Sequence, residues 1–252
     1  MDNIAFQRAC DKILKAERER KQIGTLSEKT LHAILKNYFE PDINKHEIKI
    51  SGYFADIANE NGIIEIQTGN FNVLRKKLNV FLEIAPVTLV YPIPYIKWLY
   101  WIEEDTNQIG PKRKSPKKGS PYMALIELYK IKEYLLHPNL NLCLVMINME
   151  EYKILNGWSI DKKKGSSRYD RIPTEIVEEI YIPDRTQYHK LIPKELEDGF
   201  TSKDYKKKSG LTLSKSQTAL NVLNYVGVVE RIGKIGNSYL YARAEERKVE
   251  KG

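Results

Sequence analysis

Residues 53–69 read YFADIANENGIIEIQTG and carry the clearest fold signal in the chain. Tyr53–Ala58 and Gly62–Thr68 each have the β-branched and aromatic content typical of a strand. The four residues at 59–62, NENG, are of the types that form tight turns between strands. The stretch therefore predicts a β-hairpin.

Acidic side chains occur on both predicted strands of this hairpin. Side chains alternate along a strand, so Glu65 and Gln67 share one face while Ile64 and Ile66 point into a core. Asp56 lies on the neighbouring strand, across the turn. Paired acids on adjacent strands can hold a hard divalent cation, which positions a water and neutralises charge on a phosphate.

The elements on either side of the hairpin continue an alternating pattern. A helix is predicted up to Phe39, with Ser27 as its N-cap, and a strand at His46–Ile50. Residues 71–84 resume helical spacing, and Val87–Tyr91 is a β-branched run typical of a buried strand. The predicted order is helix, three strands, helix, strand, preceded by a further helix over residues 4–22.

This order and these acids resemble the PD-(D/E)xK nuclease superfamily, over about residues 25–91 and extending toward 150. The resemblance implies that Asp56 and Glu65 bind a metal ion, Mg²⁺ or Mn²⁺, with the backbone carbonyl of Ile66 as a neutral ligand. Glu28 would support the ion through water, and Gln67 would orient the attacking water. The implied fold is an α/β, restriction-endonuclease-like mixed sheet flanked by helices.

Two positions depart from the superfamily's pattern. Ala55 stands where the motif has proline, and Gln67 stands where it usually has lysine. Without that lysine the site lacks a cation that would stabilise the transition state, and both active and inactive relatives carry glutamine there. Acids beside a turn are also commonly just solvated, and Glu28 is favoured in a first helical turn by the helix dipole alone.

Several basic or titratable residues lie close to these acids in the sequence. Arg75, Lys76 and Lys77 on the following helix would lie near the site and grip phosphate, although a solvated helix face is the commoner explanation for such a cluster. His32 follows Glu28 by one turn, so it either approaches the site or lies on the helix surface.

The middle of the chain is rich in basic loops. Residues 111–118, PKRKSPKK, and 162–168, KKKGSSR, have no aromatic residues between their charges. They therefore predict contacts to a nucleic-acid backbone rather than stacking platforms for single strands. Between them, a helix is predicted at about 121–136 and a strand at Leu142–Met149, and a boundary between domains in 182–193.

The last sixty residues follow a different pattern. A short helix at Lys194–Glu197, a second at Lys203–Lys208 and a third capped by Ser214 are predicted, followed by strands Val228–Ile232 and Ser238–Ala242. This order resembles the winged helix-turn-helix family. The resemblance implies that the third helix meets DNA bases and that neighbouring lysines meet phosphates. The implied DNA-binding residues are Lys206, Lys207, Lys208, Lys215, Gln217, Thr218, Asn221 and Lys234. A winged helix used for protein contacts is the alternative.

Composition is consistent with a nucleic-acid partner. The net charge is +8 with a pI near 9.2, and residues 193–252 carry twelve Lys and Arg against eight Asp and Glu. Two isolated cysteines, Cys10 and Cys143, suggest neither zinc nor a disulfide framework. The prolines and Lys97 within 84–102 exclude a membrane span there, and we expect a cytoplasmic protein.

Taken together, the sequence predicts a nuclease-like domain at 1–185 and a smaller winged-helix domain at 190–252. The leading hypothesis is a metal-dependent endonuclease acting on double-stranded DNA, with a homodimer plausible because two strands must be treated. The alternative is a non-catalytic DNA-binding regulator or complex subunit whose nuclease-like domain is degenerate.

Overall fold

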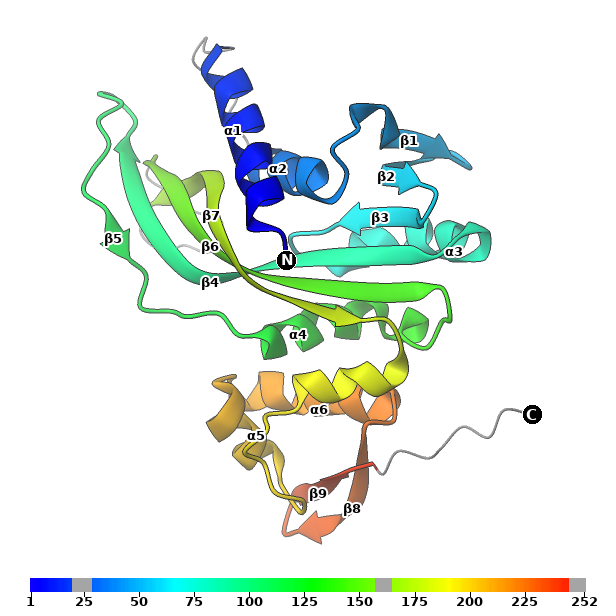
Figure 1. Cartoon of the computed structure of the whole chain (residues 1–252). Coiled ribbons are helices and arrows are strands. Elements are labelled where there is room, and N and C mark those ends of the chain that lie inside the picture. The colour runs from blue at the N-terminus through cyan, green and yellow to red at the C-terminus, as the bar shows by residue number, and fades with distance from the viewer. Residues whose placement is uncertain (20–28, 157–164, 245–252) are drawn as a thin grey trace.

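The computed structural model describes residues 1–19, 29–156 and 165–244. A mixed sheet of seven strands forms its centre, in the order β1-β2-β3-β4-β6-β7, with β5 paired to β4 (Figure 1). Pairing is parallel between β3 and β4 and between β4 and β6, and antiparallel elsewhere in the sheet. The strands are β1 His46–Ile50, β2 Tyr53–Asn59, β3 Gly62–Ile66, β4 Val87–Glu103, β5 Arg113–Lys114, β6 Leu140–Leu155 and β7 Ser166–Ile182.

Helices cover both faces of this sheet. On one face α1 and α2 pack over Ile57, Val90 and Val145, and on the other α3 and α4 pack over Leu89 and Leu142 (Figure 1). The chain is therefore a mixed α/β protein with a flanked sheet, as predicted. The α-helices are α1 Asn3–Glu19, α2 Lys29–Phe39, α3 Arg75–Ile84 and α4 Ala124–Leu128, and the 3₁₀ helices are η1 Ile43–Lys45, η2 Phe71–Leu74, η3 Pro121–Met123, η4 Tyr129–Tyr134 and η5 Arg185–Leu191.

Two strands, β4 and β6, are much longer than the sequence predicted. β4 continues for twelve residues beyond Tyr91, through Pro92 and Pro94. These prolines lie after β4 has stopped pairing with β3 at Val90 and before it pairs with β5 at Trp98. No described strand pairs with that edge between these two points, so the missing N–H groups interrupt no ladder there.

The strand β7 was not predicted, and Pro173 is the reason. A proline inside a run argues against a central strand. In the structure Pro173 lies on the edge strand of the sheet, beside a register shift between Asn148 and Met149 of β6. An edge strand with a bulge tolerates a proline, so the strand continues on both sides of it.

The C-terminal elements are α5 Ser202–Ser209, α6 Leu213–Tyr225, β8 Val229–Ile235 and β9 Ser238–Arg243. Thr201 caps α5 in a capping box with Asp204. The N-cap of α6 is Thr212, whose hydroxyl accepts from the N–H of Lys215, rather than the predicted Ser214. The predicted helix at 194–197 is a turn instead, and Phe200 pairs with Tyr241 of β9 in a single β-bridge.

The C-terminal elements α5, α6, β8 and β9 are not joined to the rest of the chain by a free linker. They pack against the helices of the large sheet. Tyr188 and Leu191 of η5, inside the segment predicted as a boundary, are buried in the same core as the sheet. The hydroxyl of Tyr205 on α5 donates to the carbonyl of Leu191 at 2.8 Å, and its ring lies edge-on to Tyr122. One continuous core thus joins the two parts. None of the helices in the described ranges is long and apolar enough to cross a membrane.

Candidate active site at the end of a β-hairpin

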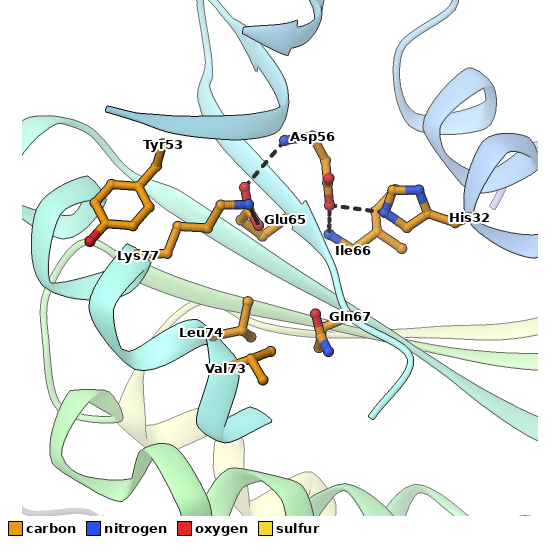
Figure 2. Close-up of a pocket in the computed structure, with 9 residues that line it drawn as sticks. All are labelled: His32, Tyr53, Asp56, Glu65, Ile66, Gln67, Val73, Leu74 and Lys77. Carbon is orange, nitrogen blue, oxygen red and sulfur yellow. Dashed lines mark hydrogen bonds and ion pairs between the residues drawn. The ribbon is translucent and has the colours of Figure 1, made fainter. Parts of the chain in front are cut away.

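The predicted hairpin exists, and its pairing stops next to the two acids. β2 and β3 pair from Asn59–Gly62 to Ile57–Ile64. Beyond that pair, backbone N–H groups of the two strands donate to side-chain carboxylates instead of to the opposite backbone. The carboxylate of Asp56 accepts the N–H of Ile66 at 2.7 Å, and the N–H of Asp56 donates to Glu65 Oε1 at 3.2 Å. Each acid is therefore anchored to the other strand (Figure 2).

Each of the two acids has a positive or titratable partner, and the two partners come from helices on opposite faces of the sheet. His32 of α2 places Nε2 3.1 Å from Asp56 Oδ2. Lys77 of α3 donates from Nζ to Glu65 Oε2 at 2.7 Å. His32 thus approaches the acids instead of lying on a free helix surface. Of the three basic residues at 75–77, Lys77 reaches the acids.

The acids line a pocket of about 250 Å³ (Figure 2). Gln67 lies on its wall, where its side-chain amide donates to the carbonyl of Gly69 and its backbone N–H donates to Val90 at 2.9 Å. Tyr53 and Val73 complete the rim and were not predicted from the sequence. The nine lining residues are His32, Tyr53, Asp56, Glu65, Ile66, Gln67, Val73, Leu74 and Lys77.

The surroundings separate the two carboxyl groups in pKa. Burial and the negative charge of Asp56 raise the pKa of Glu65 to about 7, against the opposing effect of Lys77. Burial also raises the pKa of Asp56, but the hydrogen bond and charge of His32, with the N–H of Ile66 and the charge of Lys77, outweigh it and lower the pKa. Two acids with such different pKa values in one pocket are typical of functional sites.

The raised pKa of Glu65 predicts a pH-dependent stability in metal-free buffer. A pKa raised from 4.5 means that the folded state binds more protons than the unfolded state between about pH 4.5 and 7. The contribution of Glu65 to stability is thus present below pH 4.5 and is lost as pH rises through 7. Glu65→Gln mimics the protonated side chain.

We expect the free energy of unfolding of Glu65→Gln, relative to wild type, to increase by about 1–3 kcal/mol between pH 5 and pH 8, since one pKa unit corresponds to about 1.4 kcal/mol. Urea denaturation with a chelator present measures it. A difference between the two proteins that stays constant across this pH range would contradict the raised pKa.

The donor set of this pocket fits a hard divalent cation. Asp56 and Glu65 offer carboxylate oxygens, and the buried negative charge that raises the pKa of Glu65 is what a bound cation would relieve. Among the described residues, no three His, Cys, Asp or Glu side chains come together as a metal-binding group. Mg²⁺ commonly keeps several waters and uses few protein ligands, so two carboxylates and the carbonyl of Ile66 match its needs.

The remaining predicted site residues are placed differently. Glu28 lies outside the described residues. Arg75 does not face the pocket: its guanidinium makes two hydrogen bonds to Glu133, at 2.7 and 2.9 Å, and one to the carbonyl of Lys130. This pairing could not be predicted because Glu133 comes from η4, far along the chain, and Arg75 stays exposed. Lys76 is exposed on the same helix.

Comparison with known proteins places this site in a family. The model of a domain of unknown function, DUF8091, matches residues 29–183. The chain belongs to this family. The matched stretch of DUF8091 contains all nine pocket-lining residues and ends one residue after β7.

The chain is also similar to an uncharacterized protein of Treponema pallidum (strain Nichols), 33% identical over 150 residues. These cover 59% of this chain and 57% of that protein, so the match spans less than two thirds of the relative's length. No solved structure matches the chain significantly.

Proposed function

We propose that this protein is a Mg²⁺- or Mn²⁺-dependent DNA endonuclease with a restriction-endonuclease-like domain. The observation that carries the proposal is the meeting of Asp56, Glu65 and Lys77 in one pocket at the end of the β2–β3 hairpin. The order α2, β1, β2, β3, α3, β4 supports it as well, because the superfamily that the sequence resembles has a helix, a three-stranded meander, a helix and a strand.

The residues of the pocket match the demands of phosphodiester hydrolysis. In this reaction a water oxygen forms a bond to phosphorus and gives up a proton, the bond to the leaving oxygen breaks, and that oxygen takes up a proton. A divalent cation held by Asp56 and Glu65 would supply charge neutralisation and a more acidic bound water. Gln67 would orient the attacking water. Lys77 provides the positive charge that glutamine at position 67 cannot provide.

The C-terminal elements support a winged helix that binds duplex DNA. η5, the bridge at Phe200, α5, α6 and the β8–β9 hairpin follow one another in the order that such a module requires. Exposed lysines lie on α5 and near the start of α6, where a helix can meet phosphates and bases. The exposed members of the predicted set are Lys206, Lys207, Lys208, Lys215, Gln217 and Lys234.

Two residues of the predicted DNA-binding set make side-chain hydrogen bonds within the chain. Asn221 accepts a hydrogen bond from Lys132 of η4 at 3.1 Å, and Lys132 also lies over the ring of Tyr225. The second half of α6 therefore packs against the large sheet's helices, and we leave Asn221 out of the proposed DNA contacts. The hydroxyl of Thr218 donates back to the carbonyl of Ser214.

The proposal is tested by incubating purified full-length protein with plasmid and branched DNA in Mg²⁺ or Mn²⁺ and in chelator. We expect nicked or linear products with metal alone. Titration calorimetry with Mn²⁺ should show uptake at one site per chain. Salt-dependent duplex binding with neither cleavage nor Mn²⁺ uptake would overturn the proposal in favour of a non-catalytic DNA-binding protein.

A charge change on α5 tests the winged-helix part separately. If Lys207 contacts a phosphate, Lys207→Ala should lower the slope of log binding constant against log salt by about 0.9, the value for one released counterion on duplex DNA. Fluorescence anisotropy with a labelled duplex in chelator measures the slope. Lys12→Ala, on the exposed side of α1, is the matched control. The salt slope could also stay unchanged in each of three variants, Lys206→Ala, Lys207→Ala and Lys208→Ala. That result would show that α5 does not contact DNA.

A further inference from the structure

The long strands form an extension of the sheet that the nuclease proposal does not use. After a register shift between Pro94 and Lys97, β4 continues to Glu103, pairing with β6 on one side and with β5 on the other. In Figure 1 this part curves up at the left, away from α3 and α4. We call it the arm and define it as residues 97–118 and 150–156.

One face of the arm is a row of aromatic rings beneath lysines. Tyr100 and Tyr152 pair across β4 and β6, and their rings stack at 4.8 Å with an interplanar angle of 6°. Trp98 pairs with Lys114 across β4 and β5. Lys112 lies 4.9 Å and Lys114 5.8 Å from the centre of the Trp98 ring. Cations over rings are the arrangement that aromatic nucleic-acid sites use.

A pocket of about 550 Å³ opens elsewhere on the arm. Trp101 and Leu155 form its apolar wall, and Leu155 is 41% exposed. The basic loop closes it, with Pro111 and the neighbouring Lys112 and Arg113 on its rim. A tryptophan wall with a cationic rim suits a flat base that carries a negatively charged backbone.

The basic loop at 111–118, beside this pocket, carries more charge than its ion pairs with the described chain neutralise. Residues 111–118 hold five basic side chains and no acid. Lys112 pairs with Glu150 at 2.8 Å. In the part of the chain that the structure describes, the other four, Arg113, Lys114, Lys117 and Lys118, form no ion pair with a carboxylate. This surface therefore favours an anionic partner.

We propose that the arm binds an unpaired nucleic-acid strand, with a base against Trp101 and phosphates on Arg113 and its basic neighbours. The sequence predicted backbone contacts alone for residues 111–118, because no aromatic residue lies between their charges. Strand pairing brings Trp98 opposite Lys114, sixteen residues further along the chain, and the pocket brings Trp101 beside Lys112 and Arg113. In a duplex the bases are stacked inside the helix and cannot reach an open aromatic pocket. An unpaired strand is therefore favoured as the ligand.

This site would make branched or partly single-stranded DNA the preferred substrate, a conclusion that rests on the proposed nuclease function. The binding itself does not rest on it. It is measured in chelator, where metal-dependent cleavage cannot occur, with the full chain and labelled oligothymidylate, oligouridylate and duplex DNA. The first two probes separate DNA from RNA as the source of the unpaired strand.

We expect oligothymidylate to quench the tryptophan emission of the protein saturably. Trp101→Ala should weaken the affinity of the protein for oligothymidylate about tenfold, within the range for loss of one stacked base. Trp101→Phe, which retains a ring, should restore most of the affinity. Duplex affinity should change less than about twofold, since the winged helix supplies it. Arg113→Ala, an exposed change that leaves the core intact, should lower the single-strand salt slope by about 0.7. Lys12→Ala should leave both unchanged.

Three results would overturn the proposal. The first is an affinity for oligothymidylate in both Trp101→Ala and Arg113→Ala that equals that of wild type. The second is an equal loss of affinity for duplex and for single-stranded DNA in Trp101→Ala. The third is binding of oligothymidylate without any change in tryptophan emission. If wild type fails to cleave DNA while Trp101→Ala still loses affinity for oligothymidylate, the nuclease proposal fails and the arm's function stands.

Discussion

Asp56→Asn is expected to reduce the rate of metal-dependent DNA cleavage about 10³-fold, because removing one carboxylate charge removes several kcal/mol of cation binding and each 1.4 kcal/mol is a factor of ten in rate. The replacement is nearly isosteric. Its amide oxygen can still accept the N–H of Ile66, which the carboxylate accepts at 2.7 Å in the structure. The hairpin should therefore keep its shape while its affinity for Mn²⁺ falls.

The measurement is the initial rate of plasmid nicking at one fixed Mn²⁺ concentration below the saturation of wild type, beside calorimetric Mn²⁺ titration. Glu65→Gln should behave in the same way, since both acids line one pocket. Glu178→Gln, an exposed acid on the edge strand β7, removes the same charge elsewhere and should cleave like wild type. Cleavage that survives in both Asp56→Asn and Glu65→Gln would show that the reaction takes place somewhere else.

The hairpin could be predicted from sequence because its determinants are local. Turn-forming residues at 59–62 separate two alternating runs, and the observed strands Tyr53–Asn59 and Gly62–Ile66 differ from the prediction by one or two residues at their ends. The same locality put Asp56 and Glu65 on adjacent strands. Their convergence in one pocket followed from a turn of two residues, not from any long-range contact.

The partners of those acids could not be predicted, because they come from distant segments. Nothing in the sequence shows that Lys77 reaches Glu65 while Arg75, two residues earlier on the same helix, turns to Glu133. The helical spacing does offer one signal. Residues 75 and 77 are about 200° apart around a helix axis at 3.6 residues per turn, so the two side chains had to face different surroundings.

Prolines misled the prediction of strand lengths for a related reason. A proline's cost depends on whether its edge of the strand has a partner, which is a property of the sheet. Pro92 and Pro94 pair with β6, but the opposite edge of β4 has no described strand partner at that point, and Pro173 lies on an edge strand. The aromatic residues of the arm on β4 lie beyond Pro92 and Pro94, so their position beside the basic loop at 111–118 could not be predicted from the sequence.

Lys77→Met is expected to lower the rate of DNA cleavage about 10²-fold, the usual cost of losing one preorganised donor to developing negative charge. Lys77 Nζ lies 2.7 Å from Glu65, and its charge opposes the burial that raises the pKa of Glu65. Methionine keeps the length and apolar stem of the side chain and removes the charge. DNA binding in chelator should be unchanged, because the winged helix and the arm retain their lysines.

A second substitution makes this test specific. Gln67 lines the same pocket as Lys77, so a lysine introduced there can return the missing charge from β3. The double variant Lys77→Met with Gln67→Lys should regain at least about tenfold of the lost rate, measured as initial nicking with Mn²⁺. Lys76→Met, an exposed neighbour on the same helix, should match wild type. Equal losses in Lys76→Met and Lys77→Met would mean that α3 contributes only general surface charge. Loss in Lys77→Met without rescue by Gln67→Lys would mean that the ammonium acts by holding Glu65 in place, since a charge arriving from β3 cannot reproduce that ion pair.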